Sequence, residues 1–116
     1  MTQYNRPTVV WALEELSNRN EQTRLWLSDG SSGEVSSFSE AVCVVFDGGV
    51  TMALDSGEIP TPLNSLFTEL RNLIKKIPAD VHPDKVINHP LMSDVRRVSL
   101  ALLQRLEEER CQGAPG

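Results

Sequence analysis

The sequence predicts an all-α fold on three observations. Apolar residues recur at helical spacing in several segments, and capping residues and prolines mark the ends of these segments. No segment shows the alternation of apolar and polar residues that is typical of a half-buried strand. At 116 residues the chain fits one domain with one core. We therefore expect a single domain of four to five amphipathic helices over residues 1–110, orthogonal or bundle-like, followed by a disordered tail at residues 111–116.

The N-terminal helical region is predicted over residues 8–28, with Thr8 as the N-cap residue. Its apolar stripe is formed by Val9, Ala12, Leu13 and Leu16. Trp11 lies among these residues and is expected in the core. The polar stretch that follows leaves two alternatives open: one long helix, or two shorter helices with Asn18 or Asn20 as a second cap.

A second helix is predicted over Ser37–Phe46, where Ser37 and Glu40 have the spacing of a capping box. Asp47-Gly48-Gly49 is expected to end this helix, because glycine accepts positive φ angles. A buried strand is the alternative, since the second half of the segment is rich in valine. The apolar face of the helix is formed by Phe38, Ala41, Val42, Val45 and Phe46.

Two further helices are predicted in the middle of the chain. A short one covers Val50–Asp55, with Val50, Ala53 and Leu54 on one face, and is expected to end at Gly57. The clearest helix is Pro62–Ile77, with Thr61 as its N-cap and Pro78 after its end. Its apolar stripe is formed by Leu63, Leu66, Phe67, Leu70, Leu73, Ile74 and Ile77.

The last helix is predicted over Pro90–Arg110, with a stripe formed by Leu91, Val95, Val98, Leu102 and Leu106. The proline-rich loop before it contains both histidines of the chain, His82 and His89. Each histidine precedes a proline, so the simplest interpretation is that they shape turns or cap the helix that follows. With Asp80 and Asp84 they also suggest an alternative, a metal site, although the spacing of zinc motifs is absent.

Composition limits the classes of function. The formal net charge of −5 argues against nucleic acid and anionic membranes as partners. The longest apolar run, Ala41–Phe46, is too short to span a bilayer, and the first residues lack a secretory signal, so we expect a cytoplasmic protein. A disulfide between Cys43 and Cys111 needs an oxidising compartment, so Cys43 is interpreted as a small core residue.

Charge is sorted along the chain, and this is the main functional signal. No lysine or arginine lies between Arg24 and Arg71, whereas the segment from Arg71 to Leu106 is predominantly basic. The carboxylates of the first segment are Asp29, Glu34, Glu40, Asp47, Asp55, Glu58 and Glu69. They suggest a docking surface for a basic partner, unless the basic segment of the same chain neutralises them.

We therefore expect a non-catalytic interaction protein of the inhibitor, immunity or adaptor type. Trp26, which precedes an acidic glycine-rich loop, is the candidate apolar anchor of the surface. The predicted partner-binding residues are Trp26, Asp29, Glu34, Asp47, Asp55 and Glu58. The alternative is a helical domain that binds a small molecule or metal through the His82/His89 loop.

No enzyme is expected, because the nucleophile-elbow, phosphate-loop and dinucleotide patterns are all absent from the sequence. For the same reason no cofactor is expected. A homodimer is left open, since helical domains with spare apolar surface often dimerise.

Overall fold

The computed structural model describes residues 6–27, 37–78 and 81–113. These residues form seven α-helices and no strand, which confirms the all-α prediction but exceeds the expected four to five helices. The helices are α1 (Arg6–Ser17), α2 (Arg19–Trp26), α3 (Phe38–Val45), α4 (Thr51–Asp55), α5 (Leu63–Lys75), α6 (Pro83–Ile87) and α7 (Met92–Gly113). A π-helical turn, η1 (Phe46–Val50), connects α3 to α4.

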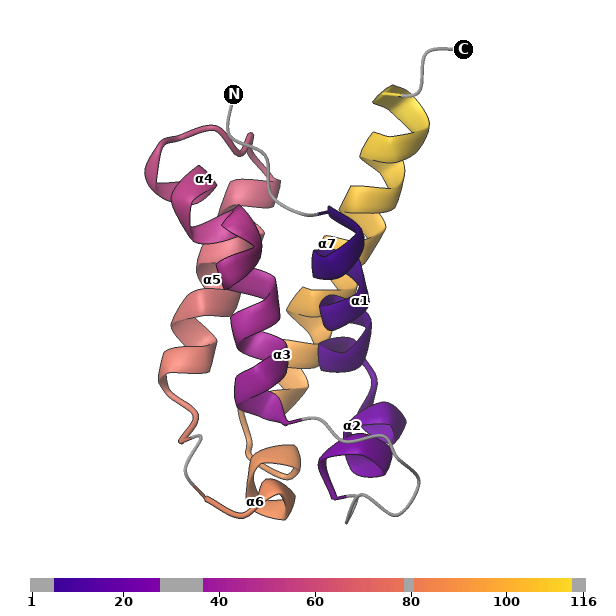
Figure 1. Cartoon of the computed structure of the whole chain (residues 1–116), viewed down its shortest axis with the longest axis vertical. Coiled ribbons are helices and arrows are strands. Elements are labelled where there is room, and N and C mark those ends of the chain that lie inside the picture. The colour runs from indigo at the N-terminus through magenta and orange to yellow at the C-terminus, as the bar shows by residue number, and fades with distance from the viewer. Residues whose placement is uncertain (1–5, 28–36, 79–80, 114–116) are drawn as a thin grey trace.

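Four helices, α1, α3, α5 and α7, run roughly along the long axis of the molecule (Figure 1). Helix α1 packs against α7 and α3, and α5 packs against α7. The short helices α2 and α6 lie together at one end of the long axis, and α4 lies at the other end (Figure 1). No helix among the described residues is long and apolar enough to cross a membrane.

The predicted apolar stripes supply most of the core. On α1, the stripe residues Val9, Ala12, Leu13 and Leu16 are all buried, as expected. Trp11 is 63% exposed, so its assignment to the core is wrong. Two residues correspond to roughly 200° of rotation around a helix. Burial of Val9 therefore places Trp11 on the outer face.

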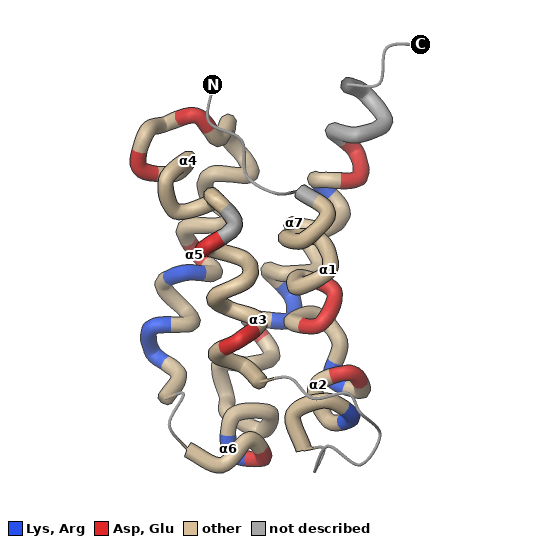
Figure 2. Tube along the Cα trace, viewed as in Figure 1, with Lys and Arg blue, Asp and Glu red and all other residues tan. Residues whose placement is uncertain are grey.

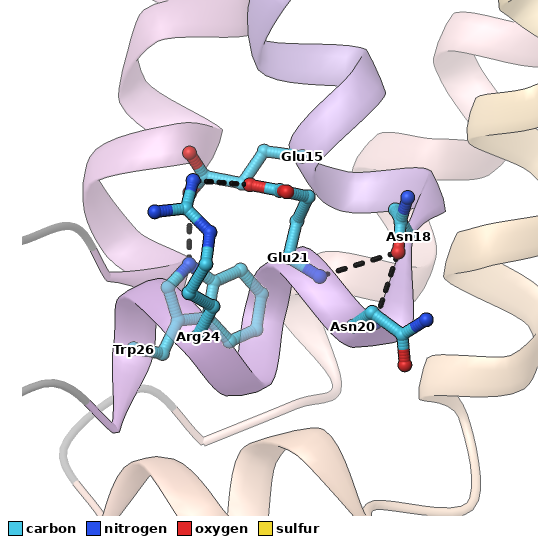
Figure 3. A network of polar contacts seen from close by, with 6 residues as sticks. All are labelled: Glu15, Asn18, Asn20, Glu21, Arg24 and Trp26. Carbon is cyan, nitrogen blue, oxygen red and sulfur yellow. Dashed lines mark hydrogen bonds and ion pairs between the residues drawn. The ribbon is translucent and has the colours of Figure 1, made fainter.

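The N-terminal region forms two helices because Asn18 caps the second one. Its side-chain oxygen accepts hydrogen bonds from the backbone N–H groups of Asn20 (2.9 Å) and Glu21 (3.2 Å), as Figure 3 shows. These N–H groups have no partner within the helix at its first turn, so the cap satisfies them. Thr8 is not an N-cap, because α1 already begins at Arg6.

Ser37 caps α3 as predicted, with its hydroxyl oxygen accepting from the backbone N–H of Glu40 at 3.0 Å. The strand alternative for the second half of this segment is wrong. Cys43 is exposed rather than part of the core, because the buried residues Ala41 and Val45 lie on the other side of α3.

Replacing Ser37 with alanine should lower the free energy of unfolding by about 0.5–2 kcal/mol, because the N–H of Glu40 loses its side-chain partner. Denaturant unfolding followed by circular dichroism measures this loss. Ser39→Ala is the matched control, since Ser39 is exposed in the same turn and its hydroxyl makes no hydrogen bond with a described residue. Equal losses in the two variants would contradict the cap.

Asp47-Gly48-Gly49 does not end the helix as predicted. The chain continues through η1, in which Gly49 has a φ of 103°, directly into α4. The N–H of Thr51 donates to the carbonyl of Phe46, five residues earlier, which is the hydrogen bond of a π-helical turn. The positive φ of glycine is therefore used to widen the helix and not to terminate it.

Helix α5 has the predicted apolar stripe but not the predicted cap. Leu63, Phe67 and Leu70 are fully or almost fully buried. Pro62, not Thr61, occupies the N-cap position, and no side chain accepts a hydrogen bond there. Proline offers no side-chain acceptor, and the N–H of Asn64 in the first turn donates instead to the backbone carbonyl of Pro60 at 2.9 Å.

Helix α7 extends to Gly113, so residues 111–113 do not belong to a tail; residues 114–116 lie outside the described part of the chain. Its predicted stripe is confirmed, with Val95, Val98, Leu102 and Leu106 buried.

Candidate acidic surface around helix α4

Helix α4 presents one buried and one exposed face at the end of the molecule. Val50 and Ala53 point into the core, with 0% and 1% of their surface exposed. Met52 lies on the opposite face and is 69% exposed, the most exposed large apolar side chain in the described part of the chain. Asp55 follows three residues later, so Met52 and Asp55 share one face of the helix.

The end of α4 is fixed by a Schellman motif. The N–H of Glu58 donates to the carbonyl of Ala53 at 3.0 Å, and the N–H of Gly57 donates to the carbonyl of Leu54 at 3.2 Å. Gly57 has a φ of 76°, which confirms its predicted role as the residue that ends the helix. The motif holds Glu58 immediately beyond the last turn, next to Asp55.

Three exposed carboxylates lie close to Met52 in the sequence: Asp47 on η1, Asp55 at the end of α4, and Glu58 after it. We call Asp47, Met52, Asp55 and Glu58 the α4 surface. Figure 2 shows acidic residues on η1, on α4 and on the turn after α4. The Glu58 carboxylate accepts a hydrogen bond from the Ser56 hydroxyl at 2.7 Å, which holds its side chain near the end of the helix.

Neutralisation of the acidic segment by the basic segment is only partial. Arg71 lies 3.9 Å from the Asp55 carboxylate, whose side chain remains 71% exposed. Glu69, outside the α4 surface, pairs with Arg97 at 3.1 Å. Asp47 forms no ion pair with any described residue. Exposed pairs of this kind contribute about 0–1 kcal/mol each, so Arg71 offsets only part of the charge of Asp55.

Asp55 and Glu58 lie at the C-terminal end of α4, where carboxylates are electrostatically unfavourable. The C-terminal end of an α-helix carries partial negative charge, which favours cations and disfavours carboxylates. Helix α5 follows the rule, with Lys75 in its last turn. The positions of these two carboxylates are therefore not explained by helix stability.

Trp26 does not belong to this surface, so its assignment as the exposed anchor is wrong. It is 4% exposed, and its indole N–H donates to the Glu15 carboxylate at 2.8 Å (Figure 3). Its ring packs edge-on against Phe38, with the ring centroids 5.8 Å apart. Helix α2, which carries Trp26, lies at the opposite end of the molecule from α4 (Figure 1).

Of the other predicted partner-binding residues, Asp47, Asp55 and Glu58 are exposed and lie on η1, on α4 and just after α4. Asp29 and Glu34 lie outside the described residues. Met52 was not predicted from the sequence, although a signal for it existed. With Val50, Ala53 and Leu54 on the inner face, the helical period places Met52 on the outer face.

One histidine caps a helix and the other stabilises a turn. His82 Nδ1 accepts from the backbone N–H of Asp84 at 3.1 Å, as the N-cap of α6. His89 Nδ1 accepts from the N–H of Leu91 at 3.1 Å, in the turn before α7. The interpretation that the histidines shape turns or cap helices is confirmed. Among the described residues, no group of three or more His, Cys, Asp and Glu side chains is placed to hold a metal ion, and Asp80 lies outside them.

Comparison of the chain with protein-family models, with curated proteins and with solved structures finds no match.

Proposed function

We propose that this chain is a non-catalytic interaction protein that binds a basic protein partner, as an inhibitor, immunity or adaptor protein does. The observation that carries the proposal is the α4 surface, in which a methionine that is 69% exposed shares one short stretch of chain with three exposed carboxylates. An apolar contact bordered by polar and charged groups is how binding interfaces are usually built, and this supports the proposal.

The two kinds of side chain have different roles in binding. The carboxylates attract a basic surface over a distance and raise the association rate, and they disfavour acidic partners. Met52 supplies apolar contact area, which holds the complex together once water is excluded. Its flexible thioether side chain adapts to the shape of a partner more easily than a branched residue does.

Reversing Asp47 and Asp55 to lysine should reduce the rate of association with the partner about tenfold or more at low salt, because the attractive field is lost. A partner captured by the wild-type chain is first purified. Stopped-flow mixing across ionic strengths then gives the rate, and the variant should show a flatter dependence on salt than the wild type. Met52→Ala should mainly raise the dissociation rate.

The matched control is Glu14→Lys with Glu107→Lys, which changes net charge by the same amount at exposed sites on α1 and α7. This control should keep most of the wild-type association rate. If both double variants slow association equally, net charge alone is responsible and the α4 surface is not the docking site. An unchanged rate with Asp47→Lys and Asp55→Lys would also refute the proposal.

A further inference from the structure

The second half of α5 carries a basic surface on the same side of the molecule as the α4 surface. Arg71, Lys75 and Lys76 lie in the second half of α5 and at its end. Figure 2 shows basic residues along this part of α5, below α4. Both lysines are exposed, and neither forms an ion pair with a described residue. The contact of Arg71 with Asp55 at 3.9 Å shows that the basic and acidic surfaces adjoin.

We infer that two copies of the chain associate about a two-fold axis, with the α4 surface of each copy on the basic half of α5 of the other. A two-fold interface uses the same patch on both subunits, so that patch must be complementary to itself. An acidic region beside a basic region meets this requirement. The two-fold rotation places the acidic region of each copy against the basic region of the other, at both ends of the interface.

Within a single copy, the acidic α4 surface and the basic residues of α5 form few ion pairs with each other. Among the described residues, Asp55 and Arg71 approach each other at 3.9 Å, the limit of ion-pair distance. Asp47, Lys75 and Lys76 are left without an oppositely charged partner among the described residues. A second copy provides these partners and also covers Met52, whose apolar surface is otherwise in water.

Such a dimer covers the α4 surface, so a basic partner must compete with the second copy for it. This consequence rests on the proposed function, whereas the dimer itself does not. The dimer is expected to be weak and sensitive to salt, because exposed ion pairs are screened. Release of the α4 surface is then controlled by protein concentration and by ionic strength.

Sedimentation equilibrium across protein concentration tests the inference on the full chain. We expect a monomer–dimer equilibrium at low salt that shifts toward monomer as salt is added. Lys75→Glu with Lys76→Glu should weaken the dimer about tenfold or more, and so should Asp47→Lys with Asp55→Lys. A mixture of these two variants should form a heterodimer, because the interface of one is then predominantly acidic and that of the other predominantly basic.

Lys85→Glu is the control, since Lys85 is exposed on α6 at the other end of the molecule and should leave the dimer unchanged. Lys75→Gln with Lys76→Gln provides a second variant in case charge reversal at the end of α5 impairs folding, which circular dichroism reports. A chain that is monomeric at all concentrations and low salt, or variants that remain monomeric when mixed, would overturn the inference. A monomeric chain that still loses its partner on reversal of Asp47 and Asp55 would leave the proposed function intact.

Discussion

Replacing Phe67 with alanine should lower the free energy of unfolding by roughly 3–5 kcal/mol. Phe67 lies on the buried face of α5, a helix that packs against α7, and 0% of its surface is exposed. The variant loses the transfer free energy of the ring and leaves a cavity that the surrounding helices fill only in part. Few single substitutions in a chain of this size are expected to cost more.

Urea or guanidinium unfolding, followed by circular dichroism and by tryptophan fluorescence, measures this loss. Asn72→Ala is the matched control on the same helix, because Asn72 is exposed and its substitution should change stability by no more than about 0.5 kcal/mol. A loss below about 1 kcal/mol for Phe67→Ala would mean that α5 presents a different face to the core.

Phe67 also illustrates what the sequence reveals about this fold. The buried faces of α1, α5 and α7 were predictable because each helix repeats its apolar residues at a period near 3.6, and the core selects that face. Ser37 and Gly57 were predictable because capping and positive φ depend on residue type within a few positions. These features are local, so the sequence specifies them directly.

The features that sequence failed to predict depend on the rest of the fold. Gly49 allows a positive φ, but only packing decides whether the chain then stops or continues through a π-helical turn into α4. The two tryptophans have the opposite burial to that expected: Trp11 is exposed and Trp26 is buried. Hydrophobicity alone favours burying both side chains. Trp11 is exposed because it lies on the face of α1 opposite the buried stripe. Trp26 can be buried because its indole N–H donates to the carboxylate of Glu15 on another helix.

The candidate site was predictable in its charge but not in its shape. The absence of lysine and arginine between Arg24 and Arg71 identified Asp47, Asp55 and Glu58 as candidates. Which carboxylates lie together depends on the end of α4 and on the path of the chain after it. The exposure of Met52 could have been deduced from the sequence. Val50, Ala53 and Leu54 were already placed on the inner face of this short helix, which leaves Met52 on the outer face.

Gln22 is the clearest residue whose role the sequence concealed. It lies in a polar stretch, yet none of its surface is exposed. Its amide nitrogen donates to the carbonyls of Glu15 (3.1 Å) and Leu16 (2.8 Å) in the last turn of α1. Carbonyls in the last turn of a helix have no partner within that helix. Gln22 satisfies the Leu16 carbonyl and adds a partner to the Glu15 carbonyl, which also accepts from the N–H of Asn18 at 3.4 Å.

The same side chain connects α2 to α7. The Nε of Arg96 donates to the Gln22 side-chain oxygen at 3.0 Å, and its Nη2 donates to the carbonyl of Ile87 at 2.6 Å. Burial lowers the pKa of Arg96 from its ordinary value, and the nearby charge of Arg19 lowers it further. A guanidinium held in this environment depends on its hydrogen-bond acceptors, because no carboxylate among the described residues pairs with it.

Replacing Gln22 with leucine should therefore lower the free energy of unfolding by roughly 2–5 kcal/mol, although leucine has a similar size and is more apolar. Each buried polar group left without a partner costs about 1–3 kcal/mol, and the variant affects the two carbonyls of α1 and the Arg96 guanidinium. Arg97→Met serves as the control for an arginine on the same helix. Its ion pairs with Glu69 (3.1 Å) and Asp94 (3.6 Å) are exposed, so the loss should stay below about 1 kcal/mol.

A double-mutant cycle that combines Gln22→Leu with Arg96→Met separates this network from simple packing. If the two side chains stabilise each other, the double variant should lose less than the sum of the single losses, by about 0.5–3 kcal/mol. Additive losses would show that Gln22 acts through the carbonyls of α1 alone. A stable Gln22→Leu variant would show that α1, α2 and α7 are held together by their apolar contacts without this network.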